Sequence, residues 1–344
     1  MKETESERST GGDEPLLVVE NLRTYFDTEG GTAKAVDGVS FSIPAGKTLA
    51  VVGESGSGKT VTALSILQLV PIPPARIVSG SIRYQGQDLL KLSKSELRKI
   101  RGSDIAMIFQ EPATSLNPVY TIGWQIAEAI RLHRKLPEDQ IQGEILKALK
   151  GVHVSDPERR LDQYPHELSG GMKQRVMIAM ALSCNPEVLI ADEPTTAVDV
   201  TIQARILDLL REIQETRKMS ILLITHDLGV VAEMADEVAV MYAGQIVERA
   251  SVEELFDHPR HPYTKGLFAG LPRIDGPRKR LEAIEGSVPA PTNFPEGCRF
   301  HDRCRWREER CLTEQGLIEA ETDHLVRCWK HAELVQLTPT TATR

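Results

Sequence analysis

The eight residues GESGSGKT at positions 53–60 constrain the fold of this chain more than any other stretch. They match the pattern G-x-x-x-x-G-K-[ST] in full, and they lie between the apolar run LAVV and a segment with apolar residues at helical spacing. The glycines let the backbone bend so that successive N–H groups and the helix N-terminus face phosphate oxygens. The sequence therefore predicts a strand, a phosphate-binding loop and a helix, in that order.

The side chains of this loop divide between phosphate and metal. Lys59 would add a cation for the phosphates, and Thr60 would supply a hydroxyl for Mg²⁺. We predict that the following residues of this segment contact the nucleotide: Gly53, Ser55, Gly56, Gly58, Lys59, Thr60 and Thr62.

Two carboxylates end the apolar run VLIADE, which the sequence predicts to be a further strand. Successive side chains of a strand point to opposite sides, so Asp192 and Glu193 are expected to have different roles. Asp192 would orient Mg²⁺ through its water shell, and Glu193 would polarise the attacking water. His226, after the strand ILLIT, fits either a contact to the γ-phosphate or a structural role. Gln110, at the end of IAMIFQ, fits either a ligand of Mg²⁺ and water or the cap of a strand.

The rest of the chain mixes strand and helix patterns. PLLVVENLRTYF (15–26) and AVDGVSFSIPAG (35–46) contain short alternating or β-branched runs that favour antiparallel strands. From about 88 to 186 the spacing is mostly helical, and PEVLIADEPT and SILLITHDL then follow as buried strands separated by a helical segment. We therefore expect an α/β fold with a mainly parallel sheet and an inserted helical subdomain.

Composition limits the partners and the location of the chain. Of its 344 residues 41% are hydrophobic and 26% charged, and no apolar run approaches the ~18 residues that a membrane span needs. A net charge of −8 argues against nucleic-acid binding, which needs a basic face. Residues 1–14 are polar and lack the apolar core of a signal peptide, so they are expected to be a disordered leader of a protein that is not exported. Any membrane association would be peripheral.

Six motifs occur along the chain in the order GESGSGKT, IFQEP, LSGGMKQR, VLIADEP, AVD and ITHD. Together they closely resemble the ATP-binding cassette of ABC transporters over about residues 15–260. The resemblance implies a P-loop NTPase fold with a RecA-like core, an antiparallel β subdomain and an inserted helical subdomain at about 110–185. It also implies that the chain binds and hydrolyses ATP with Mg²⁺.

The resemblance assigns roles around the nucleotide. It implies a set of groups near the γ-phosphate and Mg²⁺, with Glu193 as the base: Glu193, His226, Gln110, Thr60 and Asp192. Phe26 is our choice for the aromatic side chain that stacks on adenine, with Tyr25 as the alternative, because the spacing does not separate the two neighbours.

The resemblance implies that two cassettes pack head to tail, so that the LSGG helix of one covers ATP bound to the phosphate loop of the other. Ser169 is a good N-cap, and Gly170 and Gly171 permit close backbone approach, so this helix start would offer N–H donors to a γ-phosphate in trans. Asp199 matches the aspartate of the D-loop, which communicates between the two sites. Met172 stands where the family usually has Gln, a variant that also resembles peptide-importer cassettes.

Four of the five cysteines lie within the last fifty residues, at spacings C-x5-C, C-x6-C and C-x16-C. In a reducing compartment such clustering favours metal or cluster ligation over disulfides. HPYTKGLFAGLP (261–272) and PEGCRFHDRC (295–304) resemble the C-terminal extension of oligopeptide/dipeptide importer ATPases, which include nickel-import relatives. The resemblance implies a [4Fe–4S] cluster on four ligands: Cys298, Cys304, Cys311 and Cys328. Zinc and unligated thiols are the alternatives, His301 and His324 are possible substitute ligands, and Cys184 is expected to be a packed thiol.

The predicted organisation is a leader, a cassette, a C-terminal extension and a tail: 1–14, 15–260, 261–335 and 336–344. The predicted function is ATP hydrolysis that powers ABC-type import of di- and oligopeptides at the cytoplasmic face of the cell membrane. The expected partners are two transmembrane permease subunits, a second ATPase subunit and an extracytoplasmic solute-binding protein, with no nucleic acid. The second ATPase subunit is either another copy of this chain or a related chain, and we favour the related chain.

Two alternatives remain open at this level. An importer of nickel or another small solute in the same group would carry the same motifs. A soluble ABC ATPase acting on DNA or ribosomes is disfavoured, because residues 110–168 leave no room for a long coiled coil and the chain holds one cassette.

Overall fold

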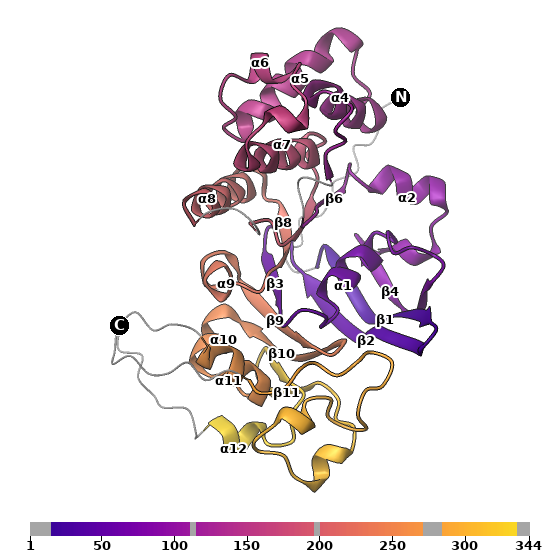
Figure 1. Cartoon of the computed structure of the whole chain (residues 1–344), viewed down its shortest axis with the longest axis vertical. Helices are drawn as coiled ribbons and strands as arrows, with labels where there is room; N and C mark the ends of the chain where they lie inside the picture. Colours follow the sequence, from indigo (N-terminus) through magenta and orange to yellow (C-terminus); the bar gives the residue numbers. More distant parts are fainter. Residues whose placement is uncertain (1–14, 111–114, 196–199, 271–283, 336–344) are drawn as a thin grey trace, which may run out of the picture.

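A computed structural model describes residues 15–110, 115–195, 200–270 and 284–335, which form two β-sheets with helices around them (Figure 1). Figure 1 shows a helical group, α4 to α7, at one end of the molecule and the C-terminal extension at the other. The central sheet lies between these two ends. No helix within the described ranges is long and apolar enough to cross a membrane.

Among the described residues, the larger sheet has eight strands in the order β11-β12-β10-β9-β3-β8-β7-β6. The bounds of these strands are β3 (Thr48–Val52), β6 (Ile105–Ile108), β7 (Val188–Asp192), β8 (Ser220–Ile224), β9 (Glu237–Tyr242), β10 (Gln245–Ser251), β11 (Ile318–Glu321) and β12 (His324–Val326). The strands from β9 to β6 pair in parallel. Every residue of β3, β7 and β8 is buried, as expected for parallel strands that are covered on both faces. The predicted mainly parallel sheet is confirmed.

The smaller sheet has four antiparallel strands in the order β2-β1-β4-β5. Their bounds are β1 (Leu17–Thr28), β2 (Gly31–Ile43), β4 (Ala75–Tyr84) and β5 (Gln87–Asp88). The first two confirm the predicted antiparallel strands. The sequence did not predict β4, because half of this strand is polar and it is held in the sheet by its pairing with β1.

The helices cover the sheets and form the helical end. Their bounds are α1 (Lys59–Ile66), α2 (Lys94–Ile100), α4 (Ile122–His133), α5 (Glu138–Gly151), α6 (Pro157–Arg160), α7 (Gly170–Leu182), α8 (Val200–Arg217), α9 (Leu228–Met234), α10 (Val252–Asp257), α11 (Pro262–Ala269) and α12 (His331–Val335). Ile126, Ile145 and Val176 come from α4, α5 and α7 and belong to one buried cluster that extends to β7 and β8. The expected inserted helical subdomain is present.

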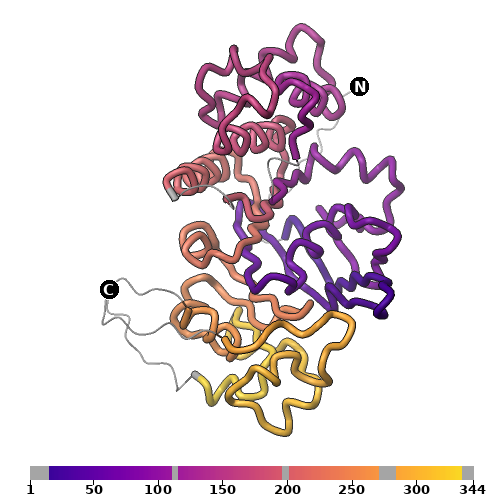
Figure 2. The backbone as a smooth tube through the Cα atoms, in the orientation of Figure 1, coloured from indigo at the N-terminus to yellow at the C-terminus, as the bar shows by residue number. Residues whose placement is uncertain are grey.

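The C-terminal extension shares the main sheet with the cassette. β12 pairs with β10 and β11 continues the sheet beyond it, and Figure 2 shows this part of the chain folded back beside β9 and β10. The buried carboxylate of Glu248 in β10 accepts hydrogen bonds from the backbone N–H groups of Arg260 and His261, at 2.6 and 2.9 Å. It also lies 2.8 Å from Nε2 of His324 in β12. The extension is therefore anchored by a strand and by a fully buried polar cluster.

Candidate functional site

The phosphate loop runs from β3 to α1 at the carboxyl edge of the parallel strands. Gly53 and Gly58 have φ values of +152° and +106°. A Cβ atom would lie 2.1 Å from the carbonyl oxygen of Met241 at the first position and 2.3 Å from that of Ala35 at the second. Only glycine adopts these positive φ values and leaves room for the two carbonyl oxygens without moving the backbone. The predicted order of strand, loop and helix is confirmed.

Lys59 lies over this loop. Its Nζ donates to the carbonyl oxygens of Gly53 at 2.8 Å and Glu54 at 3.0 Å. Burial lowers the pKa of Lys59, while the charges of Glu193 and Asp192 act in the opposite direction. The ammonium group is therefore held against the backbone whose N–H groups would surround a phosphate.

Thr60 and Asp192 meet where α1 begins and β7 ends. Thr60 Oγ1 donates to Asp192 Oδ1 at 3.2 Å. Burial raises the pKa of Asp192, and the charge of Glu193 adds to the rise. A divalent cation between a hydroxyl and a carboxylate would reverse this shift by favouring the charged form. This pair can hold Mg²⁺.

Glu193 is the centre of a three-residue contact at the same edge. Its Oε2 accepts a hydrogen bond from Gln110 Nε2 at 2.9 Å, and its Oε1 lies 3.1 Å from His226 Nδ1. Gln110 follows β6, Glu193 follows β7 and His226 follows β8, so three adjacent parallel strands deliver the three side chains. Glu193 has a φ of +48°, a left-handed conformation that is uncommon outside glycine and typical of functional sites. The structure therefore brings together the three predicted catalytic residues.

The LSGG segment begins α7, in the helical end. Ser169 is the N-cap, and its side chain accepts from the N–H of Met172 at 3.4 Å. A Cβ at Gly171 would lie 3.1 Å from the side chain of Ile202, so this glycine permits the packing of α7 on α8, whereas a Cβ at Gly170 would meet nothing within 4 Å. Figure 1 places α7 among the helices of the upper half and α1 beside β1 and β2 below. Ser169 and Gly170, at this helix start, are exposed.

The two candidate adenine-stacking residues are neighbours on β1 and therefore point to opposite faces. The hydroxyl of Tyr25 donates to Asp37 Oδ1 at 2.7 Å. Burial raises the pKa of Tyr25, and Asp37 adds to the rise. Tyr25 is thus engaged within the sheet, which favours Phe26, partly buried on the other face, for stacking on a base.

Four other predicted nucleotide contacts have different outcomes. Thr62 is 2% exposed, and its hydroxyl donates to the carbonyl oxygen of Gly58 at 3.0 Å. The geometry therefore turns Thr62 into the helix and away from the loop surface, contrary to the prediction. Ser55 and Gly56 are exposed on the loop. Asp199 lies outside the described residues.

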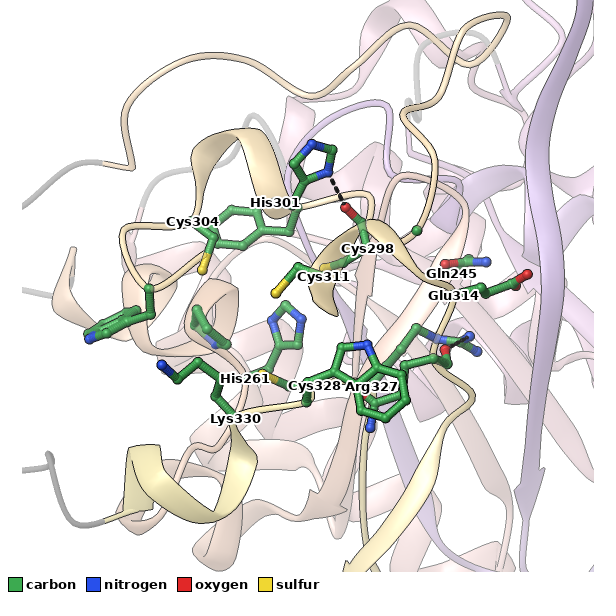
Figure 3. Close-up of a pocket in the computed structure, with 16 residues that line it drawn as sticks. Gln245, His261, Cys298, His301, Cys304, Cys311, Glu314, Arg327, Cys328 and Lys330 are labelled. Atoms are coloured by element: carbon green, nitrogen blue, oxygen red, sulfur yellow. Dashed lines mark hydrogen bonds between the residues drawn. The ribbon is translucent and has the colours of Figure 1, made fainter. Parts of the chain in front are cut away.

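A cavity in the C-terminal extension is lined by four cysteines, Cys298, Cys304, Cys311 and Cys328 (Figure 3). The first two flank the 3₁₀ helix η3 (His301–Arg303), the third lies in η4 (Glu309–Leu312), and the fourth follows β12. All four are free thiols. The tertiary structure therefore gathers the four predicted ligand cysteines around one space.

The chemistry of this cavity fits thiolate ligands, although the side chains do not form a coordination sphere. Burial raises the pKa of Cys304 to about 11 and that of Cys328 to about 12, and the neighbouring thiols add to both shifts. Arg327 and Lys330 line the same cavity and would balance the negative charge of thiolates. In the part of the chain that the structure describes, no three His, Cys, Asp or Glu side chains are arranged to hold a metal ion.

The two histidines considered as substitute ligands differ. His301 lines the cavity, with its Nδ1 2.8 Å from the carbonyl oxygen of Cys298. His324 is buried elsewhere and lies 2.8 Å from Glu248 and 3.4 Å from Glu254. Because both nitrogens of His324 face carboxylates, the geometry does not support His324 as a ligand.

Sequence reasoning missed a contact between the extension and the phosphate loop. The backbone N–H of Glu54 donates to the hydroxyl of Tyr263 at 2.8 Å, and the carboxylate of Glu54 pairs with Arg303. The segment CRFHDRC, in which two arginines stand directly beside two of the cysteines, was the available signal. It does not reveal which part of the cassette the arginines contact.

The sequence analysis also did not predict an exposed apolar patch on the helical subdomain. Val119 is 69% exposed, and the rings of Tyr120 and Trp124 stack with their centroids 3.9 Å apart. Both aromatic side chains are about two-fifths exposed, at 41% and 40%. These three residues lie within six positions of one another in the sequence and expose apolar side chains on the helical subdomain.

Comparisons with known families agree with this geometry. A family model described as ABC transporter matches residues 36–196. A second, described as the C-terminal region of oligopeptide/dipeptide transporters, matches residues 247–311. The two matches cover the phosphate loop with its carboxylates and the larger part of the cysteine-lined extension.

Several curated proteins are similar over nearly the whole chain. The oligopeptide transport ATP-binding protein AppD of Bacillus subtilis is 51% identical over 319 residues, which are 92% of this chain and 97% of that protein. The dipeptide transport ATP-binding protein DppD of the same organism is 50% identical over 317 residues, 92% and 95% of the two chains. A putative peptide import ATP-binding protein of Brucella abortus is 49% identical over 314 residues, 91% and 94%.

Solved structures resemble the cassette. The dimeric post-hydrolysis structure of the ATP-binding cassette MJ0796, bound to ADP and Pi, has a TM-score of 0.62 and 26% identity, and covers 69% of this chain and 98% of that one. The structure of cbiO1 from Clostridium perfringens, part of the ABC transporter complex cbiONQ, has a TM-score of 0.61 and 30% identity over 71% and 91% of the two chains.

Proposed function

The chain belongs to the ATP-binding subunits of ABC transporters, in the oligopeptide/dipeptide group, and we propose from this premise that it hydrolyses ATP to drive the import of di- and oligopeptides. The observation that carries the ATPase chemistry is the contact of Gln110, Glu193 and His226 beside the phosphate loop. The names of the similar proteins and the match of the C-terminal extension support peptides as the imported solute.

Glu193 is the general base in this proposal. The oxygen of a water molecule bonds to the γ-phosphorus while Glu193 takes a proton from that water. The bond between the γ-phosphorus and the bridging oxygen breaks, and its electron pair stays on the ADP. Gln110 and His226 contact different oxygens of the Glu193 carboxylate, so they hold it in one orientation.

The phosphates and Mg²⁺ are bound by the other groups. Lys59 and the N–H groups of the loop bind the phosphates, and Phe26 stacks on the adenine. Thr60 and Asp192, which already contact each other, and Gln110 hold Mg²⁺, which neutralises phosphate charge. The LSGG helix start supplies the remaining donors from a second cassette. Its openness at Gly170 supports this role.

The partners follow from the family and from the surface. Membrane permeases are implied for an importer ATPase, and we assign the apolar patch of Val119, Tyr120 and Trp124 to a permease contact at the cytoplasmic face of the membrane. The second cassette is a related chain, and an extracytoplasmic solute-binding protein delivers the peptide.

We propose that the four cavity cysteines hold a [4Fe–4S] cluster, with zinc as the alternative. The supporting observation is that Cys298, Cys304, Cys311 and Cys328 line one cavity that also contains cationic side chains. Such a cluster would cross-link the segments that carry its ligands and supply a one-electron redox centre. The chain is purified anaerobically for this test. Its iron content, sulfide content and visible absorption spectrum then distinguish the cluster from zinc.

The transport proposal is tested by co-purification from gently solubilised membranes, with the chain tagged at its native locus. Recovery of two multi-span permeases and a second ATPase supports it, and recovery of ribosomal or DNA-repair proteins without a permease contradicts it. Uptake of labelled peptide and of labelled nickel, in cells with and without the gene, distinguishes the two importer classes.

A further inference from the structure

The segment CRFHDRC, residues 298–304, lies between the cysteine cavity and the nucleotide-binding cassette. Its terminal cysteines, Cys298 and Cys304, line the cavity. Its two arginines contact the cassette, and each arginine is the direct neighbour of one of these cysteines. We call residues 298–304 the bridging segment.

Arg303 makes the closest contact between this segment and the phosphate loop. Its Nη1 donates to Oε2 of Glu54 at 2.7 Å and its Nη2 to Oε1 at 3.0 Å, a bidentate pair. The Arg303 side chain is 7% exposed and that of Glu54 is 29% exposed. Burial lowers the pKa of Arg303, but the hydrogen bonds and charge of Glu54 outweigh this and raise it overall. A pair of this geometry with little exposure is a stronger restraint than a surface salt bridge.

Arg303 is itself held on several sides. Its guanidinium donates to the carbonyl oxygens of Glu285 at 2.9 Å and Ile284 at 3.4 Å. It also lies 5.7 Å from the ring centroid of Tyr242 in β9. Since the guanidinium is fixed from both the extension and the cassette, it defines the position of the Glu54 carboxylate.

Arg299 forms a second connection from the same segment. It pairs with Asp37 in β2 and donates to the carbonyl oxygen of Ala243. Asp37 also accepts a hydrogen bond from the hydroxyl of Tyr25, which is next to the proposed adenine-stacking Phe26 in the sequence. The bridging segment therefore contacts the cassette at the phosphate loop through Arg303 and at the antiparallel sheet through Arg299.

We propose that Arg303 is a positioning residue for ATP binding, which holds the carboxylate of Glu54 on the extension and so keeps it from Lys59 and from the phosphates of the nucleotide. The inference rests on the ATPase function proposed above. It makes ATP affinity depend on the fold of the bridging segment, and thus on the extension.

The reason lies in the charges beside the loop. The ammonium of Lys59 already contacts the carbonyl oxygen of Glu54, and the negative charge of Glu54 acts on it. Without Arg303, the Glu54 carboxylate competes with the phosphates for this cation and repels their negative charge. Removing the carboxylate as well removes the competitor.

The test is a double-variant comparison on the full chain: Arg303→Gln, Glu54→Gln and both together, measured by equilibrium binding of a fluorescent ATP analogue. We expect Arg303→Gln to weaken binding about tenfold and the double variant to bind within about twofold of the wild type. Arg303→Lys should bind between these values, because lysine keeps the charge without the bidentate geometry. In the assembled transporter, Arg303→Gln should raise the KM for ATP and leave kcat unchanged.

Arg310→Gln is the matched control. Arg310 also belongs to the extension, but its partners Glu308 and Glu333 lie there too, so ATP binding should not change. If Arg303→Gln binds ATP with wild-type affinity, the inference is overturned. It is also overturned if Arg303→Gln and the double variant lose ATP affinity equally and both lose thermal stability in parallel. If the wild-type chain binds no ATP, the proposed function itself fails.

Discussion

At the nucleotide site the functional groups stand at the ends of parallel strands, whereas at the cysteine cavity they stand on loops and one-turn helices. Gln110, Glu193 and His226 follow three adjacent strands, and Gln110 and His226 both contact Glu193. The four cysteines line one cavity, but within the described residues no three His, Cys, Asp or Glu side chains are arranged to hold a metal ion. The comparison indicates that side chains placed at the ends of packed strands contact one another directly, whereas side chains carried by loops and one-turn helices share a space with looser mutual geometry.

The largest expected effect tests the nucleotide site. Glu193→Gln keeps the shape of the side chain but removes the base, so we expect ATP turnover in the assembled transporter to fall by about three orders of magnitude. ATP binding should persist, because Lys59 and the loop N–H groups are unchanged. Steady-state phosphate release and equilibrium ATP binding measure the two quantities. Turnover within tenfold of wild type would show that Glu193 is not the base.

The second prediction concerns the backbone of the phosphate loop. Gly53→Ala places a Cβ atom 2.1 Å from the carbonyl oxygen of Met241, so the loop must move. We expect ATP binding to weaken by about a hundredfold or more, because the N–H groups lose their common direction. Gly143→Ala in α5 is the control, since a Cβ there meets nothing within 4 Å. Unchanged ATP affinity in Gly53→Ala would contradict this account of the loop.

The third prediction tests the cavity in the metal-free chain. Burial raises the pKa of Cys304 to about 11, so at pH 8 less thiolate is present than for an ordinary cysteine. A thiolate of higher pKa is also more nucleophilic, and the net expectation is alkylation about tenfold slower than for an exposed cysteine. The rate should rise as the pH approaches 11 and level off above it. Iodoacetamide labelling followed by peptide mass spectrometry measures it, and a plateau reached by pH 9 would contradict the buried environment.

The smallest expected effect separates the cavity from the remaining cysteine. Cys184 lies on the helical subdomain, where its Sγ is 3.5 Å from the carbonyl oxygen of Ala129. Cys184→Ser should leave iron content and ATP turnover within about twofold of wild type, because serine keeps this hydrogen bond. Cys311→Ser should lose the iron of the proposed cluster. Equal iron loss in both variants would remove the distinction that we draw between the five cysteines.

Much of the nucleotide site could be predicted from the sequence because its chemistry is local. The segment 53–60 contains its own glycines, cation and hydroxyl, and the carboxylates Asp192 and Glu193 stand directly after an apolar run. For Thr62 this reasoning was insufficient, since the helix that follows the loop buries its hydroxyl against Gly58. Local order predicts which residue types are near the site, and helix geometry decides which of them face it.

The sequence by itself determined the phosphate loop, the carboxylate pair that follows an apolar strand, the order of the motifs and the cysteine content. Only the tertiary structure decided that β12 joins the main sheet and that Arg303 reaches Glu54. It also decided that His324 pairs with Glu248 and does not lie among the cavity cysteines. These contacts join segments far apart in the chain, and any arginine has many carboxylates within its possible reach. Packing of the extension against the sheet selects one of them, and that selection has no local signal in the sequence.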